Sequence, residues 1–108
     1  MYNLENLKKT LGNNQDTLKI LLKVFFRTIP EQIKSINEAY QNKDIETISF
    51  IAHKLKTSFL TVGMLDLVNV IREIQENCDN KNFEIANDLF EKLNAVFIKE
   101  LELLENEL

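Results

Sequence analysis

The chain has one histidine, His53, followed by lysines at the next position and two positions further on. An imidazole in water is largely uncharged near neutral pH, so one ring nitrogen keeps a lone pair and can act as a nucleophile. On a helix, Lys56 lies one turn after His53 and about 60° round from it, while Lys54 points about 100° away. If the group on the ring nitrogen is a phosphoryl, ammonium groups compensate the charge of its oxygens. The residues therefore indicate a nucleophilic histidine with a cation beside it.

Other kinds of chemistry lack the residues that they need. The sequence has only two glycines and no Gly-rich phosphate loop, and one histidine cannot supply the repeated Glu-x-x-His pattern of a helical di-metal site. Enzymes of the Ser/His/Asp or Cys/His kind need a second group held against the histidine. The single cysteine, Cys78, belongs to the apolar face of another segment, so we expect a structural role for it. We therefore expect no metal site, no cofactor of the protein's own and no complete enzyme active site.

The segment around His53 predicts a helix whose buried side is distinct from its histidine side. With Ile48 at zero and about 100° per residue, the apolar stripe falls within about 40° of one direction and His53 lies at about 140°. Phe50 and Leu60, at about −160° and 120°, share the histidine side and suggest a surface for a partner; covering the end of the first helix is the alternative for Phe50. The expected core residues are Ile48, Ala52, Leu55, Phe59 and Val62, with Ile45 and Ile51 flanking them.

The segments before this helix also predict amphipathic helices, because their apolar residues recur three and four positions apart. A short helix is expected to end at Gly12, and a long helix to begin at a cap among residues 13–16. Pro30 interrupts the long helix, yet the apolar stripe keeps its phase across it. This pattern predicts one kinked helix, and the alternative is two helices broken near Thr28.

Two polar turns organise the rest of the chain. Asp44 can cap the helix that carries His53, and that helix is expected to end at Gly63. A fourth amphipathic helix follows, and either Asn80 or Asn82 can cap the last one. The side of the last helix that carries Glu91, Glu100, Glu102 and Glu105 is expected to face solvent.

The composition fits one folded domain over residues 1–108. Hydrophobic residues make up 44% of the chain, which favours a globule over disorder. Four long amphipathic helices joined by short loops predict an all-α fold, namely an antiparallel up-and-down four-helix bundle with a short additional N-terminal helix. We expect a monomer, because a closed bundle leaves no spare apolar stripe.

The charge and the apolar runs exclude further classes of function. A net charge of −4 leaves no excess of cations for nucleic-acid phosphates. No apolar run approaches the roughly 18 residues of a membrane span, and a single cysteine fits a reducing compartment. We therefore expect a cytoplasmic protein that binds no nucleic acid and inserts into no membrane.

The residues around the histidine also resemble the phosphoacceptor motif of histidine-containing phosphotransfer (HPt) domains. That motif is usually an Ala-His-x-Leu-Lys-Gly run with a glycine seven residues after the lysine, and this chain has Ala52, His53, Leu55, Lys56 and Gly63. The resemblance covers nearly the whole chain. HPt domains are helical bundles of two-component phosphorelays, which receive a phosphoryl group from the aspartate of one receiver domain and pass it to the aspartate of another.

The resemblance implies a role for each matched residue. His53 would be phosphorylated, Lys56 would stabilise the phosphoryl group, and Lys54 would add positive potential. Gly63 would keep the surface above the helix end open to a docking receiver. The chain departs from the pattern at Thr57, which stands where the family usually has glycine and fills space that normally admits the partner.

In several family members a residue of the following helix hydrogen-bonds the imidazole. An ungapped count of the spacing puts Gln75 there, and Arg72 or Glu76 would serve if that helix is rotated. The resemblance implies a phosphoryl carrier whose partner, a response-regulator receiver domain, holds a divalent cation such as Mg²⁺. A hybrid sensor histidine kinase is a further expected partner, and the chain would be either a free protein or a domain of such a kinase. The rival hypothesis is a non-catalytic helical adapter that binds a receiver, and a weaker one is direct acceptance from an autokinase domain.

Overall fold

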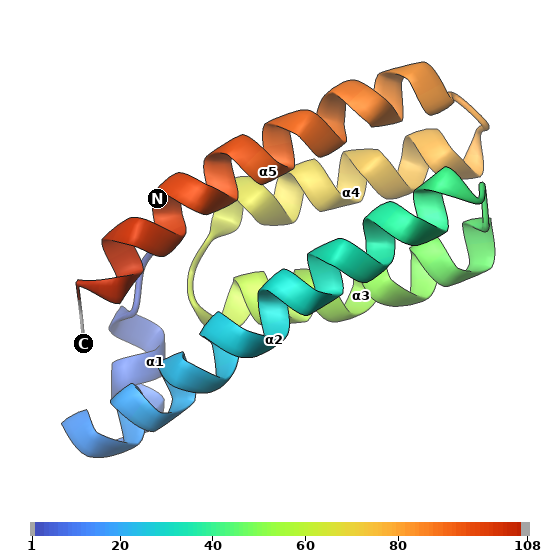
Figure 1. Ribbon diagram of the computed structural model, residues 1–108. Coiled ribbons are helices and arrows are strands. Elements are labelled where there is room, and N and C mark those ends of the chain that lie inside the picture. The colour runs from blue at the N-terminus through green and yellow to red at the C-terminus, as the bar shows by residue number, and fades with distance from the viewer. Residues whose placement is uncertain (1, 107–108) are drawn as a thin grey trace.

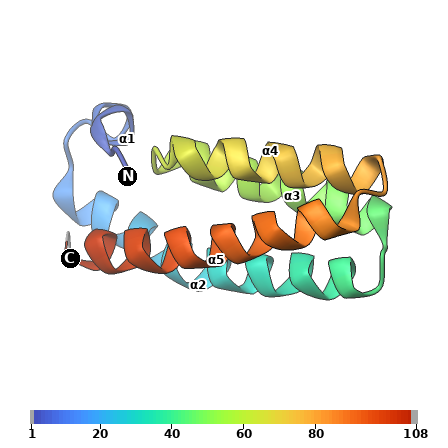
Figure 2. The same ribbon diagram turned by 90° about the horizontal axis from the view of Figure 1, so that it is seen from above.

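The computed structural model describes residues 2–106, and all regular structure in that range is α-helical (Figure 1). The long helices run alternately in opposite directions, and the short first helix lies at one end of them (Figures 1 and 2). The predicted four-helix bundle with a short N-terminal helix is therefore confirmed. The helices are α1 (Glu5–Thr10), α2 (Gln15–Gln41), α3 (Ile45–Thr61), α4 (Leu65–Asp79) and α5 (Phe83–Glu105).

The first four helices end in the same way. After each one a residue takes a positive φ, and the N–H of the following residue bonds back to a carbonyl five positions earlier, as from Met64 to Phe59 at 2.8 Å. This Schellman arrangement satisfies carbonyls that the helix itself leaves free. The expected ends of the first and third helices are confirmed. The residues with positive φ are Gly12 and Asn13, Lys43, Gly63, and Lys81.

Side chains cap the beginnings of two helices as the sequence predicts. The Asn14 side chain accepts a hydrogen bond from the backbone N–H of Thr17 at 3.1 Å. The Asp44 carboxylate accepts from the backbone N–H of Thr47 at 3.2 Å and from its hydroxyl at 2.6 Å. Asn82 occupies the cap position of α5, but its side chain makes no capping hydrogen bond.

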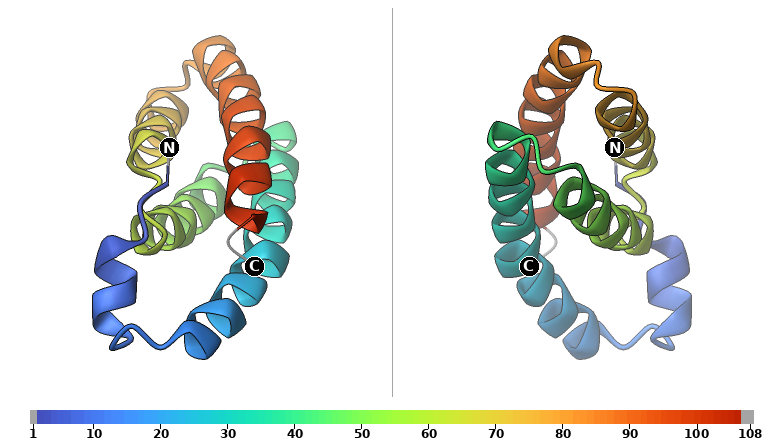
Figure 3. Two further views of the ribbon diagram at one scale, coloured as in Figure 1. Left: turned by 90° about the vertical axis from the view of Figure 1, so that its left-hand side faces the viewer. Right: turned by 90° about the vertical axis from the view of Figure 1, so that its right-hand side faces the viewer.

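The long helix α2 passes Pro30 without a break. Proline removes one backbone hydrogen bond, but Ile29 and Ile33 on either side of it are both buried in the core, so tertiary packing holds the helix together. Figure 3 shows the first turns of α2 diverging from the other long helices toward α1. The single-helix alternative is confirmed, and the break near Thr28 is wrong.

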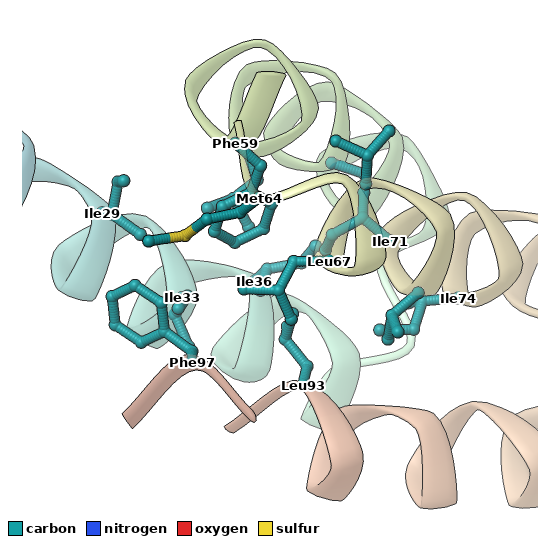
Figure 4. Close-up of a cluster of buried hydrophobic side chains, with 14 of the residues drawn as sticks. Ile29, Ile33, Ile36, Phe59, Met64, Leu67, Ile71, Ile74, Leu93 and Phe97 are labelled. Carbon is teal, nitrogen blue, oxygen red and sulfur yellow. The ribbon is translucent and has the colours of Figure 1, made fainter. Parts of the chain in front are cut away.

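Side chains from all four long helices meet in one buried cluster (Figure 4). Within it the rings of Phe59 and Phe97 lie with their centroids 6.2 Å apart. Fully burying a large apolar side chain contributes about 1.5–3 kcal/mol, so this cluster fixes the position of α3 strongly. The labelled members are Ile29, Ile33 and Ile36 of α2, Phe59 of α3, Met64, which precedes α4, Leu67, Ile71 and Ile74 of α4, and Leu93 and Phe97 of α5.

The last helix departs from the sequence prediction at Glu100, which is only 4% exposed and not on a solvent face. Glu100 follows Leu93 by seven residues and Phe97 by three, so it shares the side of the buried stripe. The N-terminal segment approaches this end of α5, where the Tyr2 hydroxyl donates to the carbonyl of Leu103 at 3.4 Å. The prediction for Glu100 was wrong, because its position on the helix places it beside the buried stripe although its side chain is an acid. Glu91, Glu102 and Glu105 are exposed as expected.

Candidate functional site

The helix α3 presents His53 to solvent while its opposite side is completely enclosed. The predicted apolar stripe is buried, and His53 on the other side is exposed. The predicted orientation of the histidine is therefore confirmed. Because rotation of α3 would expose its apolar stripe, the bundle fixes the direction in which the imidazole leaves the surface. The stripe residues Ala52, Leu55, Phe59 and Val62 are 0% exposed and Ile48 is 1% exposed.

Lys56 lies on the side of the histidine face that borders α4. It is half-buried, and its position on the helix is within about 20° of Ser49, whose hydroxyl touches α4. The stem of a lysine can pack along apolar surface while its ammonium stays in water. This placement keeps a cation one turn from the imidazole.

Lys54 lies on the opposite side, toward α2. Its ammonium stands 4.3 Å from the centroid of the Phe50 ring, a cation–π geometry that stabilises by about 0.5–1 kcal/mol at an exposed site. The same side chain lines a cleft between α3 and α2. The two lysines beside His53 therefore have different surroundings, and the charge of Lys54 is held over an aromatic ring.

Gln75 reaches the histidine helix from α4, one turn before the histidine. Its side-chain amide donates to the hydroxyl of Ser49 at 2.8 Å, in a partly buried position. Arg72 and Glu76 are exposed on the same helix. The structure thus places Gln75 at the level of Ser49, one turn before His53, and gives its amide a partner that the sequence did not reveal. A role for Gln75 in orienting the imidazole stays a prediction.

Thr57 stands one turn after His53 on the exposed side of α3. Its hydroxyl donates to the backbone carbonyl of His53 at 3.1 Å, a common way for threonine to satisfy its hydroxyl within a helix. Phe50 and Leu60 are exposed, at 62% and 52%. Phe50 lies under the ammonium of Lys54. This position does not fit the alternative in which Phe50 covers the end of the first helix. Docking roles for all three residues stay predictions.

Gly63 serves a contact that the sequence did not suggest. Its φ is 69°, and a Cβ at this position would overlap the backbone of Asn3. The N–H of Asn3 also donates to the carbonyl of Val62 at 3.3 Å. The expectation of open surface above Gly63 is therefore wrong, because the N-terminal segment occupies that space. A role for Gly63 in docking a receiver stays a prediction, but open surface above the helix end no longer supports it.

The described residues contain no cluster of three or more His, Cys, Asp or Glu side chains that would hold a metal ion. Over the same residues, no helix combines the length and apolar character that crossing a bilayer requires. Along α3, the charged residues nearest to the exposed imidazole in sequence are Lys54 and Lys56. The site is thus one imidazole and two ammonium groups on a rigid helix.

Fold and site together define a helical-bundle protein that presents one exposed imidazole on a helix whose other side is buried. The sequence matches the Hpt domain family over residues 20–107, and the chain belongs to that family. Its role is histidine phosphotransfer in a phosphorelay, in which Hpt domains exchange phosphoryl groups with receiver domains. Such domains are phosphoryl carriers and are generally not catalytic themselves.

The fold is also similar to the crystal structure of histidine-containing phosphotransfer protein B from Pseudomonas aeruginosa PAO1. The TM-score is 0.85 at 23% sequence identity, over 96% of this chain and 88% of that chain. At this level of identity the likeness concerns the fold. A comparison with curated proteins gives no match.

Proposed function

We propose that His53 is the residue that carries the phosphoryl group, and that the chain passes it between the aspartates of receiver domains. One observation supports this assignment above the others. His53 is the only histidine in the sequence, and it is exposed in the middle of a helix whose opposite side is fully buried. A phosphotransfer domain needs an accessible imidazole, and no second one is available.

The transfer needs little from this chain beyond a well-placed nucleophile. The lone pair of the ring nitrogen attacks the phosphorus of an aspartyl phosphate on the first receiver. An N–P bond forms as the P–O bond to the carboxyl group breaks, and the electron pair of that bond stays on the departing carboxylate. Transfer to the second receiver is the reverse reaction with a new carboxylate.

Charge compensation is shared between the two proteins. Phosphoryl transfer depends mainly on positioning and on electrostatic stabilisation of the phosphoryl oxygens. In our proposal Lys56 supplies a positive charge from this side, and a divalent cation in the acidic pocket of the receiver supplies it from the other. The protein is then a carrier whose reaction is completed by its partner.

The test is to mix the protein with a receiver domain that carries a labelled aspartyl phosphate. We expect the chain to acquire label that is lost in acid and kept in alkali, and the His53→Gln variant to acquire none. Label on the variant, or none on the wild type with several receivers, would contradict the proposal. Binding of a receiver without label would favour the adapter, and label from ATP plus an autokinase domain would indicate direct acceptance.

A further inference from the structure

Phe50 is a neighbour of both His53 and Lys54 on the exposed side of α3. It precedes His53 by three residues and Lys54 by four, and both spacings bring side chains together on a helix. Long side chains on a helix also lean toward its N-terminus, onto the turn before their own. The side chains of His53 and Lys54 therefore extend over the same turn, which carries the Phe50 ring, 62% exposed.

The Phe50 ring holds the ammonium of Lys54 in the structure. The nitrogen lies 4.3 Å from the ring centroid, well within the roughly 6 Å of a cation–π contact. Because Lys54 is exposed, such a contact changes an equilibrium by about two- to fivefold, equivalent to about 0.5–1 kcal/mol. The contact thus gives the ammonium a preferred place without locking it there.

A phosphoryl group on His53 would be a stronger partner for the same ammonium. A protein-bound phosphoryl group carries three acceptor oxygens and a charge of roughly −1.5 to −2 near neutral pH. Attraction between opposite charges in contact exceeds the attraction of a cation to an exposed aromatic ring. The stem of a lysine has four carbons and rotates freely, so Lys54 can exchange one partner for the other without a change in the backbone.

We infer that phosphorylation of His53 draws the ammonium of Lys54 from the Phe50 ring to the phosphoryl oxygens, and that Phe50 is a positioning residue that limits how tightly the phosphoryl group is held. The inference deepens the proposed function and rests on it. A carrier must give up the group that it accepts, and a cation bound to that group without competition would favour retention. The Phe50 ring competes for this cation and so weakens the retention.

NMR spectra before and after phosphorylation test the movement of Lys54 directly. The phosphoryl donor is phosphoramidate in its ammonio form, so that no receiver is present. The imidazole lone pair attacks the phosphorus and an N–P bond forms, while the P–N bond of the donor breaks and its electron pair leaves with ammonia.

Protons above the face of an aromatic ring resonate upfield, so those on Cε of Lys54 should lie upfield of their position in Phe50→Leu. Once His53 is phosphorylated, we expect them to lose this upfield shift. The Cε protons of Lys56, on the other side of the imidazole, are the control and should be the same in wild type and Phe50→Leu. An upfield shift of Lys54 that persists in the phosphorylated protein would overturn the inference.

The equilibrium constant of phosphoryl transfer measures the competition between ring and phosphoryl group. The protein is mixed at high dilution with a phosphorylated receiver domain, and the concentrations of the four free species give the constant for transfer to His53. This constant depends only on the end states. Any part that Phe50 plays in docking therefore changes the rates of transfer and leaves the constant as it is.

We expect Phe50→Leu to raise this constant about two- to fivefold in favour of the phosphohistidine, and to have no effect in a Lys54→Ala background. Phe50→Tyr keeps an aromatic face and should match the wild type. Lys56→Ala should change the constant by the same factor whether residue 50 is Phe or Leu. A constant unchanged by Phe50→Leu, or raised equally without Lys54, would overturn the inference.

Labelling keeps this result distinct from a failure of the proposed function. If the wild type acquires no phosphoryl group from phosphoramidate or from any receiver, or if His53→Gln acquires as much, the proposed function fails and the inference fails with it. If His53 is labelled but the Lys54 signals and the equilibrium constants stay unchanged, only the inference fails.

Discussion

At the scale of single residues, the two lysines next to the histidine have equal charge but different surroundings. The Lys54 ammonium is 4.3 Å from the Phe50 ring centroid, on the α2 side. Lys56 is half-buried on the α4 side, one turn from His53. A positive charge stabilises a phosphoryl group only if it lies close to that group. Because the two ammonium groups lie on different sides of His53, we expect them to contribute unequally to phosphoryl transfer.

We predict that Lys56→Ala lowers the initial rate of phosphoryl acceptance by about tenfold or more, whereas Lys54→Ala lowers it by less than about threefold. Removing one well-placed donor from an enclosed site costs on the order of 10²–10³-fold, and an exposed site should lose less. The measurement is the rate of label transfer from one phosphorylated receiver to each variant. A larger loss for Lys54→Ala would show that Lys56 is only a surface residue.

Thr57 gives a second test at this scale. In the Thr57→Gly variant we expect faster phosphoryl transfer, because the side chain next to the imidazole is removed, and a stability about 1 kcal/mol below that of Thr57→Ala, because glycine is unfavourable within a helix. Thr57→Ala is the control: it also loses the hydroxyl bonded to the carbonyl of His53 but keeps the Cβ and the helix propensity. Transfer rates that do not rise in either variant would mean that the threonine leaves the approach of the receiver unhindered.

At the scale of the helices, periodicity predicted how α3 is turned but not what covers its end. The stripe from Ile48 to Val62 is buried and His53 is exposed, because a 3.6-residue repeat in apolar residues has one stable orientation against a core. Periodicity contains no information on contacts between residues far apart in sequence. The approach of Asn3 to Gly63 and the bond from Gln75 to Ser49 therefore went unpredicted.

The two glycines offer a matched test of the contact at Gly63. Both have positive φ, but a Cβ on Gly12 meets nothing within 4 Å, whereas one on Gly63 overlaps the backbone of Asn3. We predict that Gly12→Ala costs about 1–2 kcal/mol, the usual penalty for a left-handed conformation. Gly63→Ala should cost about 3 kcal/mol or more, because the N-terminal segment must also move, as in other overpacked sites.

Denaturant unfolding of the two variants measures this difference. Hydrogen exchange adds a local readout, since the amide of Asn3, bonded to the carbonyl of Val62 at 3.3 Å, should lose protection in Gly63→Ala and keep it in Gly12→Ala. Equal costs for the two substitutions would show that the N-terminal segment does not stabilise the bundle.

At the scale of the whole molecule, two weakly acidic side chains, one buried and one half-buried, make the stability of the fold depend on pH in the alkaline range. Burial, with a smaller effect of the nearby Asp79 charge, raises the pKa of the Cys78 thiol above its ordinary value of 9.0. Burial is also the main cause that raises the pKa of the Tyr40 hydroxyl above 10.0, followed by the charges of Cys78 and Asp88. Both groups are thus harder to ionise in the folded protein than in the unfolded chain.

The sign of the effect follows from proton binding. Between the unfolded and the folded pKa the unfolded chain holds fewer protons, so the free energy of unfolding decreases as pH rises. Below about pH 8 we expect these two groups to leave the free energy of unfolding unchanged. We predict that it falls as the pH passes 9.0, because of Cys78, and falls further as the pH passes 10.0, because of Tyr40. Urea unfolding at successive pH values from 7 to 10.5 measures the slope.

Variants identify which group causes the loss. Cys78→Ala should be less stable at pH 7, because it leaves space in the core, but its stability should decline less steeply between pH 8.5 and 10 than that of the wild type. Tyr40→Phe should flatten the decline above pH 10 and also lose the hydrogen bond to the carbonyl of Phe83, which is 2.6 Å long and joins α2 to α5. An equally steep decline in the double variant would show that other groups, and not this pair, set the alkaline limit of the fold.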